Sequence, residues 1–201
     1  FGTFNPIHIG HLMIANHLAE HTSLDQVWMV VTPHNPLKNK DTLLDNYQRL
    51  ELVFLATEDY PKIKPSDIEF KLTQPNYTVN TLAHLQEKYP QHTFSLIMGE
   101  DNLKSLHKWK NYEVILQNHE IYVYPRLDTK GQTQTDTSLK GELAKQKIAF
   151  KYNPKIHFID APIVEISSTF IRENIKKKKN VRPLLPSKVW EYIDYNNLYK
   201  K

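Results

Sequence analysis

Residues 2–11 read Gly-Thr-Phe-Asn-Pro-Ile-His-Ile-Gly-His, and this decapeptide carries the clearest information about both fold and chemistry. Gly2–Pro6 predicts a turn, and a helix is expected to begin near His8 or Ile9. The apolar face of that helix is formed at helical spacing by Leu12, Ile14, Ala15 and Leu18. Because the turn comes so early, we expect most of a first strand to lie before Phe1.

The two histidines of the decapeptide predict an anion site. His8 and His11 are three residues apart, so both imidazoles are expected on one side of the first helical turn. That turn also offers backbone N–H groups and the positive end of the helix dipole. Gly10 between them would let a ligand approach the backbone closely. Zinc binding is a weaker alternative, because no HExxH glutamate or other third ligand accompanies the pair.

A second anion motif lies near the other end of the chain. Residues 165–172 read Glu-Ile-Ser-Ser-Thr-Phe-Ile-Arg and are expected to lead into a helix. A serine or threonine at a helix start is explained by capping alone. Here the hydroxyls of Ser167, Ser168 and Thr169 come together with the guanidinium of Arg172 one turn later. Hydroxyls, helix N-terminus and guanidinium together favour a phosphate site.

Between these motifs, strand-length apolar runs alternate with helical patterns. The expected strands are 26–32, 93–98, 120–124 and 156–159, and the expected helices are 46–57, 77–89, 169–176 and 187–196. Such alternation predicts an α/β fold, a doubly wound parallel sheet with crossover helices and a C-terminal helical segment. The polar stretch 128–140 predicts a loop or small insertion. Open parallel sheets bind ligands beyond the carboxyl ends of their strands.

Composition restricts the class of protein. The 201 residues fit one domain, 1–201, and the absence of cysteine excludes disulfides and thiolate metal sites. We see no membrane-length apolar run and no signal-peptide pattern, so we expect a cytoplasmic protein without membrane contact. Residues 172–201 carry nine Lys/Arg and three Asp/Glu, whereas the remainder carries 17 and 19. The basic excess is therefore local, and Lys176–Lys179 is most simply a solvated helix end, with anion steering as the minority interpretation.

The decapeptide resembles the HxGH signature of the nucleotidyltransferase superfamily, and residues 166–172 resemble its ISSTxIR motif. The resemblance implies a Rossmann-like nucleotidyltransferase fold. It also implies that His8 and His11 contact the ATP phosphates and stabilise charge as the α-phosphorus is attacked. Ser167, Ser168, Thr169 and Arg172 would hold the β- and γ-phosphates. Charge stabilisation of this kind is what nucleotidyl transfer chiefly needs from a protein.

Three further stretches resemble the bacterial nicotinate-nucleotide adenylyltransferase family. Asn35-Pro36-Leu37-Lys38 matches a phosphate-contacting lysine at Lys38, although the family usually has histidine where Leu37 stands. Asn76–Leu82 resembles SYTxDTL, with Asn80 in place of aspartate. Met98–Trp109 resembles GADxLxxLxxW. The alternatives are an exposed loop lysine at Lys38 and ordinary core packing for Trp109.

The resemblance implies ATP and nicotinate mononucleotide as ligands, with no nucleic acid, and leaves homo-oligomerisation open. The implied catalytic residues are His8, His11, Lys38 and Arg172. The implied ATP-binding residues are Gly2, Thr3, Phe4, Gly10, Gly99, Asp101, Ser167, Ser168 and Thr169. The implied mononucleotide-binding residues are Tyr77, Thr78, Asn80 and Trp109. Mg²⁺ would be held mainly by ATP phosphates and water, with no metal-ligand set in the protein.

Two alternatives remain open at this point. Another adenylyl- or cytidylyltransferase of the superfamily, such as phosphopantetheine adenylyltransferase, shares the first and last phosphate motifs. A non-catalytic nucleotide- or RNA-binding module is the remote alternative, since its expected marks, loss of the histidine pair or a broad basic face, are not seen.

Overall fold

A computed structural model describes residues 1–33, 43–125, 150 and 152–200. The chain forms two compact units, one of Phe1–Asn76 with Ile166–Lys201 and one of Tyr77–Glu165. The predicted residues Leu37 and Lys38, and the predicted loop 128–140, lie outside the described residues. The prediction of a single domain stays a prediction, and each unit is described by itself.

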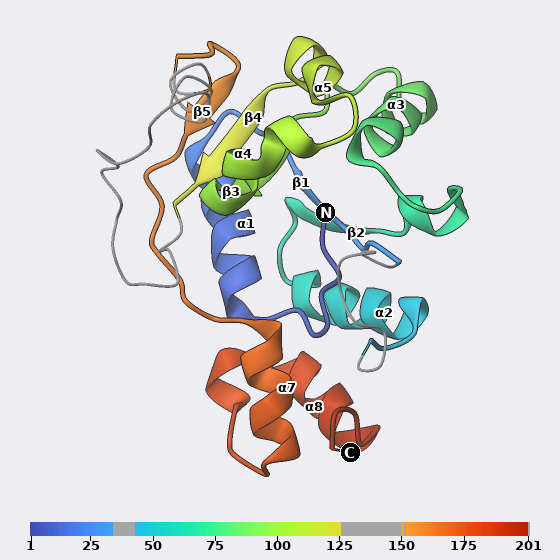
Figure 1. Ribbon diagram of the computed structural model, residues 1–201. Helices are drawn as coiled ribbons and strands as arrows, with labels where there is room; N and C mark the ends of the chain where they lie inside the picture. The colour runs from blue at the N-terminus through green and yellow to red at the C-terminus, as the bar shows by residue number, and fades with distance from the viewer. Residues whose placement is uncertain (34–42, 126–149, 151, 201) are drawn as a thin grey trace. The chain divides into compact units, whose positions relative to one another are not determined.

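The first unit is built around a parallel pair of strands, β1 (Val27–Val30) and β2 (Ile63–Ser66). The opening residues run beside β1: Gly2 forms a parallel bridge with Val31, its N–H donates to the Val30 carbonyl at 3.0 Å, and its carbonyl accepts from Thr32 at 2.8 Å. The helices of this unit are α1 (Ile9–His21), α2 (Asn46–Thr57), α7 (Ser168–Lys176) and α8 (Ser187–Tyr195), with short 3-10 turns at Ile68–Lys71 and Arg182–Leu184 (Figure 1).

Helix α2 has the bounds that the sequence predicts, and its start is capped by Asp45, whose carboxylate accepts from the Tyr47 N–H at 2.8 Å. Its buried face differs from a simple apolar pattern. Phe54 is 52% exposed, whereas the side chain of Arg49 is fully buried on the same face as Leu52 and Val53. Helix α8 packs against α2, and Lys188 of α8 donates to Glu58 at 2.6 Å.

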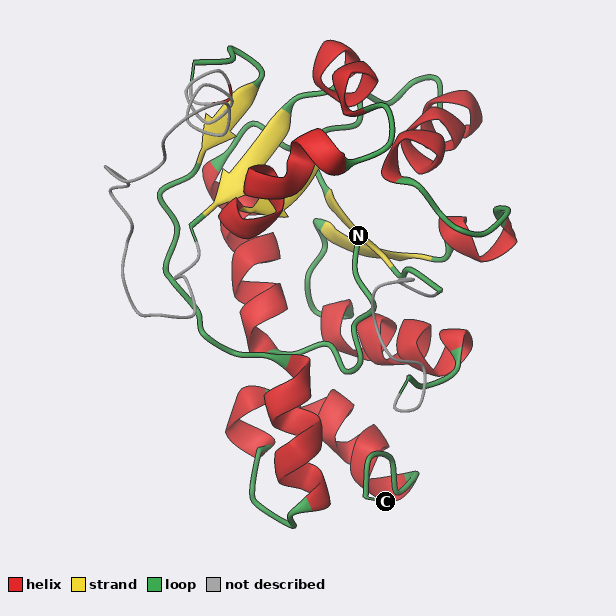
Figure 2. Ribbon diagram, in the orientation of Figure 1, coloured by secondary structure: helices red, strands yellow, loops and turns green. Residues whose placement is uncertain are grey.

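The second unit holds a three-stranded parallel sheet in the order β3 (Leu96–Gly99), β4 (Ile121–Tyr124), β5 (Ile156–Phe158). Its helices are α3 (Thr78–Lys88), α4 (Glu100–Ser105) and α5 (Tyr112–Asn118), with a 3-10 turn at Leu106–Lys108 (Figure 2). The buried side chains that join strands to helices are Leu82, Leu96, Met98, Leu103, Leu106, Ile115, Ile121, Val123, Phe150 and Ile156. Strands with apolar residues on both faces are typical of sheets covered on two sides.

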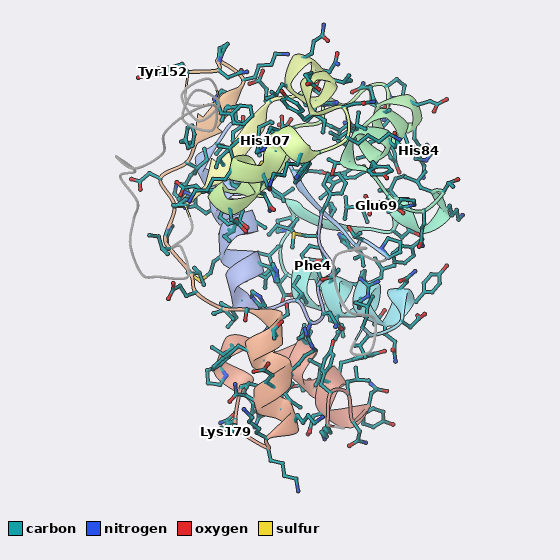
Figure 3. The ribbon with its side chains drawn as sticks, viewed as in Figure 1. Phe4, Glu69, His84, His107, Tyr152 and Lys179 are labelled. Atoms are coloured by element: carbon teal, nitrogen blue, oxygen red, sulfur yellow. The ribbon has the colours of Figure 1, made fainter. Side chains whose placement is uncertain are left out.

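The predicted elements are present with small shifts at their ends. The predicted strand 26–32 is formed by Val27–Val30, and the predicted strand 93–98 begins only at Leu96. Ile14, expected on the buried face of α1, is only half-buried, while Ala19 is buried there. The lysines that follow α7 are exposed, and the side chain of Lys179 extends away from the chain (Figure 3), as a solvated helix end requires. Across the described residues, no helix combines the length and the apolar character that crossing a membrane requires.

Candidate active site

The ring of Phe4 packs inside the opening turn of the first unit, against Gly2 and His11. Phe4 has a left-handed backbone, φ 44°, and its side chain is buried (Figure 3). A Cβ at Gly2 would lie 2.9 Å from this ring, so a side chain at position 2 would displace it. The ring also meets the edge of His11, with 5.1 Å between centroids. Gly2 and Phe4 therefore act together to place the start of α1.

The two motif histidines stack at the start of α1, on one side of its first turn as the spacing predicts. His8 is the N-cap residue, and the ring centroids of His8 and His11 are 3.7 Å apart. The His8 backbone N–H donates to Nδ1 of His11 at 3.3 Å. Because Nδ1 accepts, the neutral ring of His11 carries its proton on Nε2, which makes Nε2 a donor suited to an anion. Gly10, between the two, is buried in the same turn.

The second motif is bonded directly to the first. Ser168, the first residue of α7, donates its hydroxyl to the Pro6 carbonyl at 2.9 Å. Nη1 of Arg172 donates to the Asn5 carbonyl at 2.7 Å, and its Nη2 donates to the Thr169 hydroxyl at 3.3 Å. A guanidinium has five N–H groups, so these bonds orient Arg172 and still let it bind phosphate bidentately.

Ser167 has the structural role that the sequence offered as an alternative, which is helix capping. Its side chain accepts from the Phe170 N–H at 3.1 Å and so caps α7. The structure thus brings together the predicted residues Gly2, Thr3, Phe4, His8, Gly10, His11, Ser167, Ser168, Thr169 and Arg172 in one unit. Lys38, predicted beside them, lies outside the described residues.

Arg49 follows the Asn35–Lys38 stretch in the resemblance to the adenylyltransferases, but the sequence prediction assigned it no role in the site. Its guanidinium donates to the carbonyls of Thr3 at 2.6 Å, Thr32 and Pro33 at 2.7 Å, and Leu44 at 3.1 Å, and to the Asn46 side chain at 2.7 Å. Burial lowers the pKa of Arg49 from its ordinary value, but an arginine at that level still keeps its charge at neutral pH.

The bonds of Arg49 have an electrostatic consequence for the opening turn. The carbonyls of Thr3, Asn5 and Pro6 accept hydrogen bonds from Arg49, Arg172 and Ser168 respectively. Three acceptors of the turn are thereby directed toward positive or polar donors. This arrangement lessens the partial negative charge that a phosphate would meet at the turn. The opening turn and the first turn of α1 together are a candidate anion cradle.

In the second unit, three of the four residues predicted to bind the mononucleotide lie at the start of α3: Tyr77, Thr78 and Asn80. Tyr77 is the N-cap residue, 40% exposed, and Nζ of Lys110 lies 4.4 Å from the centroid of its ring. Thr78 is the first residue of the helix, and Asn80 is exposed in its first turn with its N–H donating to the Tyr77 carbonyl at 2.9 Å. Lys110 is a further cation at this place that the sequence prediction did not include.

Gly99 and Asp101 lie where β3 ends and α4 begins. A Cβ at Gly99 would lie 2.6 Å from Oδ1 of Asp101 and 3.2 Å from the Tyr124 ring, so the carboxylate rests directly on the glycine. Trp109 is partly buried and packs against the core of its unit, which accords with the plain packing interpretation for one part of its surface. Its exposed part remains available for stacking on a planar ring.

Comparison with known proteins places this arrangement in a family. A family model described as cytidylyltransferase-like matches residues 1–174. A protein of Flavobacterium psychrophilum named "Probable nicotinate-nucleotide adenylyltransferase" is 75% identical over 201 residues, which are 100% of this chain and 97% of the relative. A protein of the same name from Bacteroides thetaiotaomicron is 42% identical over 196 residues, covering 96% of this chain and 87% of the relative.

Solved structures share the fold at lower identity. The Plasmodium falciparum nicotinic acid mononucleotide adenylyltransferase has a TM-score of 0.74 at 20% identity, with 98% of this chain and 94% of that chain covered. A putative nicotinate-nucleotide adenylyltransferase of Vibrio parahaemolyticus has a TM-score of 0.68 at 22% identity, covering 100% and 93%. The predicted Rossmann-like nucleotidyltransferase fold is thus confirmed. The chain belongs to the cytidylyltransferase-like family and, within it, to the nicotinate-nucleotide adenylyltransferases, and is therefore a nucleotidyltransferase enzyme.

Proposed function

We propose that the enzyme transfers AMP from ATP to nicotinate mononucleotide, giving nicotinate adenine dinucleotide and pyrophosphate in NAD biosynthesis. The observation that carries the proposal is the stacked pair of His8 and His11 at the start of α1, bonded through the opening turn to Ser168 and Arg172. The names of the relatives support the choice of substrate, and the Plasmodium falciparum structure was solved with NaAD.

The reaction requires that the reacting phosphates be positioned and that their negative charge be stabilised. An oxygen of the mononucleotide phosphate forms a bond to the α-phosphorus, and the bond from that phosphorus to the bridging oxygen of the pyrophosphate breaks. The attacking phosphate is anionic near neutral pH, so no general base is required. His8, His11, Lys38 and Arg172 would counter the charge that develops on the transferring phosphates, and Nε2 of His11 is one defined donor for it.

Binding roles follow for each unit separately. In the first unit, Gly2, Thr3, Phe4 and Gly10 would shape the anion cradle for ATP, with the hydroxyls of 167–169 on its phosphates. In the second unit, Gly99 and Asp101 would bind ATP, the carboxylate of Asp101 serving hydroxyl groups. Tyr77, Thr78, Asn80 and Trp109 would bind the mononucleotide, with aromatic rings on the pyridine.

Magnesium fits this donor set as an ion that arrives with ATP. The groups of the cradle are imidazoles, hydroxyls and a guanidinium, which bind phosphate oxygens, whereas Mg²⁺ prefers oxygen ligands. Within the described ranges, no three His, Asp or Glu side chains gather as a metal site. In the proposal, ATP phosphates and water would hold the ion, which when bound would neutralise charge on the leaving pyrophosphate.

A substrate panel tests the proposal. Pyrophosphate release is measured with ATP or CTP and with nicotinate mononucleotide, its amide analogue or phosphopantetheine. We expect ATP and nicotinate mononucleotide to give the highest kcat/KM. Turnover of phosphopantetheine alone would refute the choice of acceptor, and salt-sensitive RNA binding without any turnover would revive the non-catalytic alternative. A cytoplasmic location and a homo-oligomeric state stay predictions.

A further inference from the structure

The C-terminal segment after α8 reaches the opening turn of the same unit. The hydroxyl of Tyr199 donates to Oδ1 of Asn5 at 2.7 Å. The same Oδ1 accepts the backbone N–H of Leu44 at 3.3 Å, and the carbonyl of Asn5 accepts from Arg172. Asn5 is only 4% exposed and lies three residues before His8. Asn5 is therefore the point where the opening turn, the entry to α2, helix α7 and the C-terminal segment meet.

The backbone of this segment is bent to bring Tyr199 to that point. Asn197 and Tyr199 both have left-handed backbones, with φ of 54° and 61°. Such conformations are unfavourable for residues with a side chain and persist where surrounding contacts hold them. The N–H of Leu198 donates to the Ile193 carbonyl at 3.0 Å and ties the segment to α8. The bent backbone of residues 197–199 thus places the Tyr199 side chain against Asn5.

The surroundings of the hydroxyl keep it a donor. Burial raises the pKa of Tyr199 well above its ordinary value, although the nearby cations Arg172 and Arg49 act in the opposite direction. The phenol therefore stays protonated at any pH at which the enzyme would work. A protonated hydroxyl gives Oδ1 of Asn5 a constant partner, which a phenylalanine of the same shape would not provide.

We propose that Tyr199 is a positioning residue for AMP transfer: through Asn5 it fixes the opening turn that sets His8 and His11. The inference depends on the proposed function only because it takes AMP transfer as the reaction that is affected. The hydroxyl of Tyr199 ends on the opening turn itself, so its removal should act first on that turn. A small displacement of the histidines should cost rate, because donors act on the transition state only in the correct geometry.

The test compares Tyr199→Phe with two matched controls. Tyr195→Phe removes a hydroxyl from the last residue of α8, at a side chain that is 88% exposed. Thr57→Val removes a buried hydroxyl that donates to the Val53 carbonyl at 2.9 Å in α2. For Tyr199→Phe we expect kcat to fall about three- to tenfold at 20 °C, the rate equivalent of one lost hydrogen bond, with KM changed less. Both controls should keep the wild-type kcat, although Thr57→Val should lower Tm.

A residue that only stabilised the fold would behave as Thr57 does. An unchanged kcat for Tyr199→Phe at 20 °C, with or without a lower Tm, would overturn the proposal. A double-mutant cycle with Asn5→Ala adds a second criterion: if Tyr199 acts through Asn5, its replacement should cost little in the Asn5→Ala background. Full additivity of the two losses would contradict the proposed route. If Asn5→Ala does not fold, the comparison with the two controls decides by itself.

Histidine NMR separates failure of this proposal from failure of the proposed function. Ring signals of His8 and His11 are assigned by His8→Gln and His11→Gln. Tyr199→Phe should shift them, whereas Tyr195→Phe and Thr57→Val should not, and unchanged ring signals would refute the positioning role. If another acceptor replaces nicotinate mononucleotide, the kinetic comparison is made with that acceptor. If no acceptor is turned over, the ring signals decide.

Discussion

The predicted site residues of the two units are held in opposite ways. In the first unit the carbonyls of Thr3, Asn5 and Pro6 are each bound by a donor from α2 or α7, and most of the turn is buried. In the second unit Tyr77, Asn80 and Asp101 are exposed on the first turns of helices. We expect from this contrast that the candidate phosphate site of the first unit is preorganised and intolerant of change, whereas the candidate binding residues of the second unit can be altered side chain by side chain.

Among these variants, replacement of Arg49 should have the largest effect, and that effect is on the free energy of unfolding. A small effect would contradict the contrast between the two units. Arg49→Met leaves five acceptors without their buried donor, so we expect the free energy of unfolding to fall by about 3–5 kcal/mol. Urea denaturation measures the change. Lys62→Met is the control, because its ion pair with Glu20 is half-exposed and should contribute at most about 1 kcal/mol. A loss for Arg49→Met no larger than the control's would show that the turn is not held as described.

Removal of the His11 side chain should have the second largest effect, and that effect is on kcat. His11→Ala should lower kcat by about 10²–10³-fold, or about 2.7–4 kcal/mol, as expected for the loss of a preorganised donor. Steady-state pyrophosphate release measures it. His17→Ala on the same helix is the control, since His17 stacks on His21 at 4.6 Å and lies outside the first turn. Equal rates for the two variants would remove the phosphate role from the pair.

A side chain at Gly99 tests whether the second unit also contains a tightly fitted point. Gly99→Ala must displace the Asp101 carboxylate, since its Cβ would lie 2.6 Å from Oδ1. We expect KM for ATP to rise about tenfold, equivalent to about 1.4 kcal/mol. If the effect runs through Asp101, adding Gly99→Ala to Asp101→Ala should cause no further rise. A further rise of similar size would mean that the glycine matters for another reason.

Lys110 should give the smallest effect. Lys110→Met removes the cation over Tyr77, a contact of about 0.5–1 kcal/mol, so KM for the mononucleotide should rise about two- to fivefold with kcat unchanged. Lys108→Met, two residues earlier and exposed, is the control. A fall in kcat for Lys110→Met would mean that this region too is coupled to the chemistry, and the contrast between the units would weaken.

Secondary structure was predictable where periodicity and capping agree. Helix α2 has a capping aspartate before it and apolar residues at helical spacing, and its bounds were predicted as found. Strand β2 was missed because its sequence, Ile-Lys-Pro-Ser, contains an exposed lysine and a proline and so lacks an apolar run. Helices α4 and α5 are six and seven residues long, too short for a helical period to stand out.

The site was predictable where short motifs carry it, and not where distant residues support it. His8, His11, Ser168 and Arg172 stand out in sequence. Arg49 gave a weaker sign, because it occupies the helical position that faces inward beside Leu52 and Val53, where an apolar residue would be expected. Tyr199 gave none, since no local pattern indicates that a tyrosine in the tail contacts Asn5.

The bond between Asn5 and Tyr199 also has a consequence for how the chain folds. It closes a loop of 194 residues, and Arg172 closes one of 167 residues onto the same asparagine. Contacts of such long range form late, because the entropy of closing the loop must be offset by structure already in place. During synthesis the opening turn would therefore become ordered only after the C-terminal segment has been made. We expect a chain released before Tyr199 to acquire much of its secondary structure while lacking an ordered histidine pair.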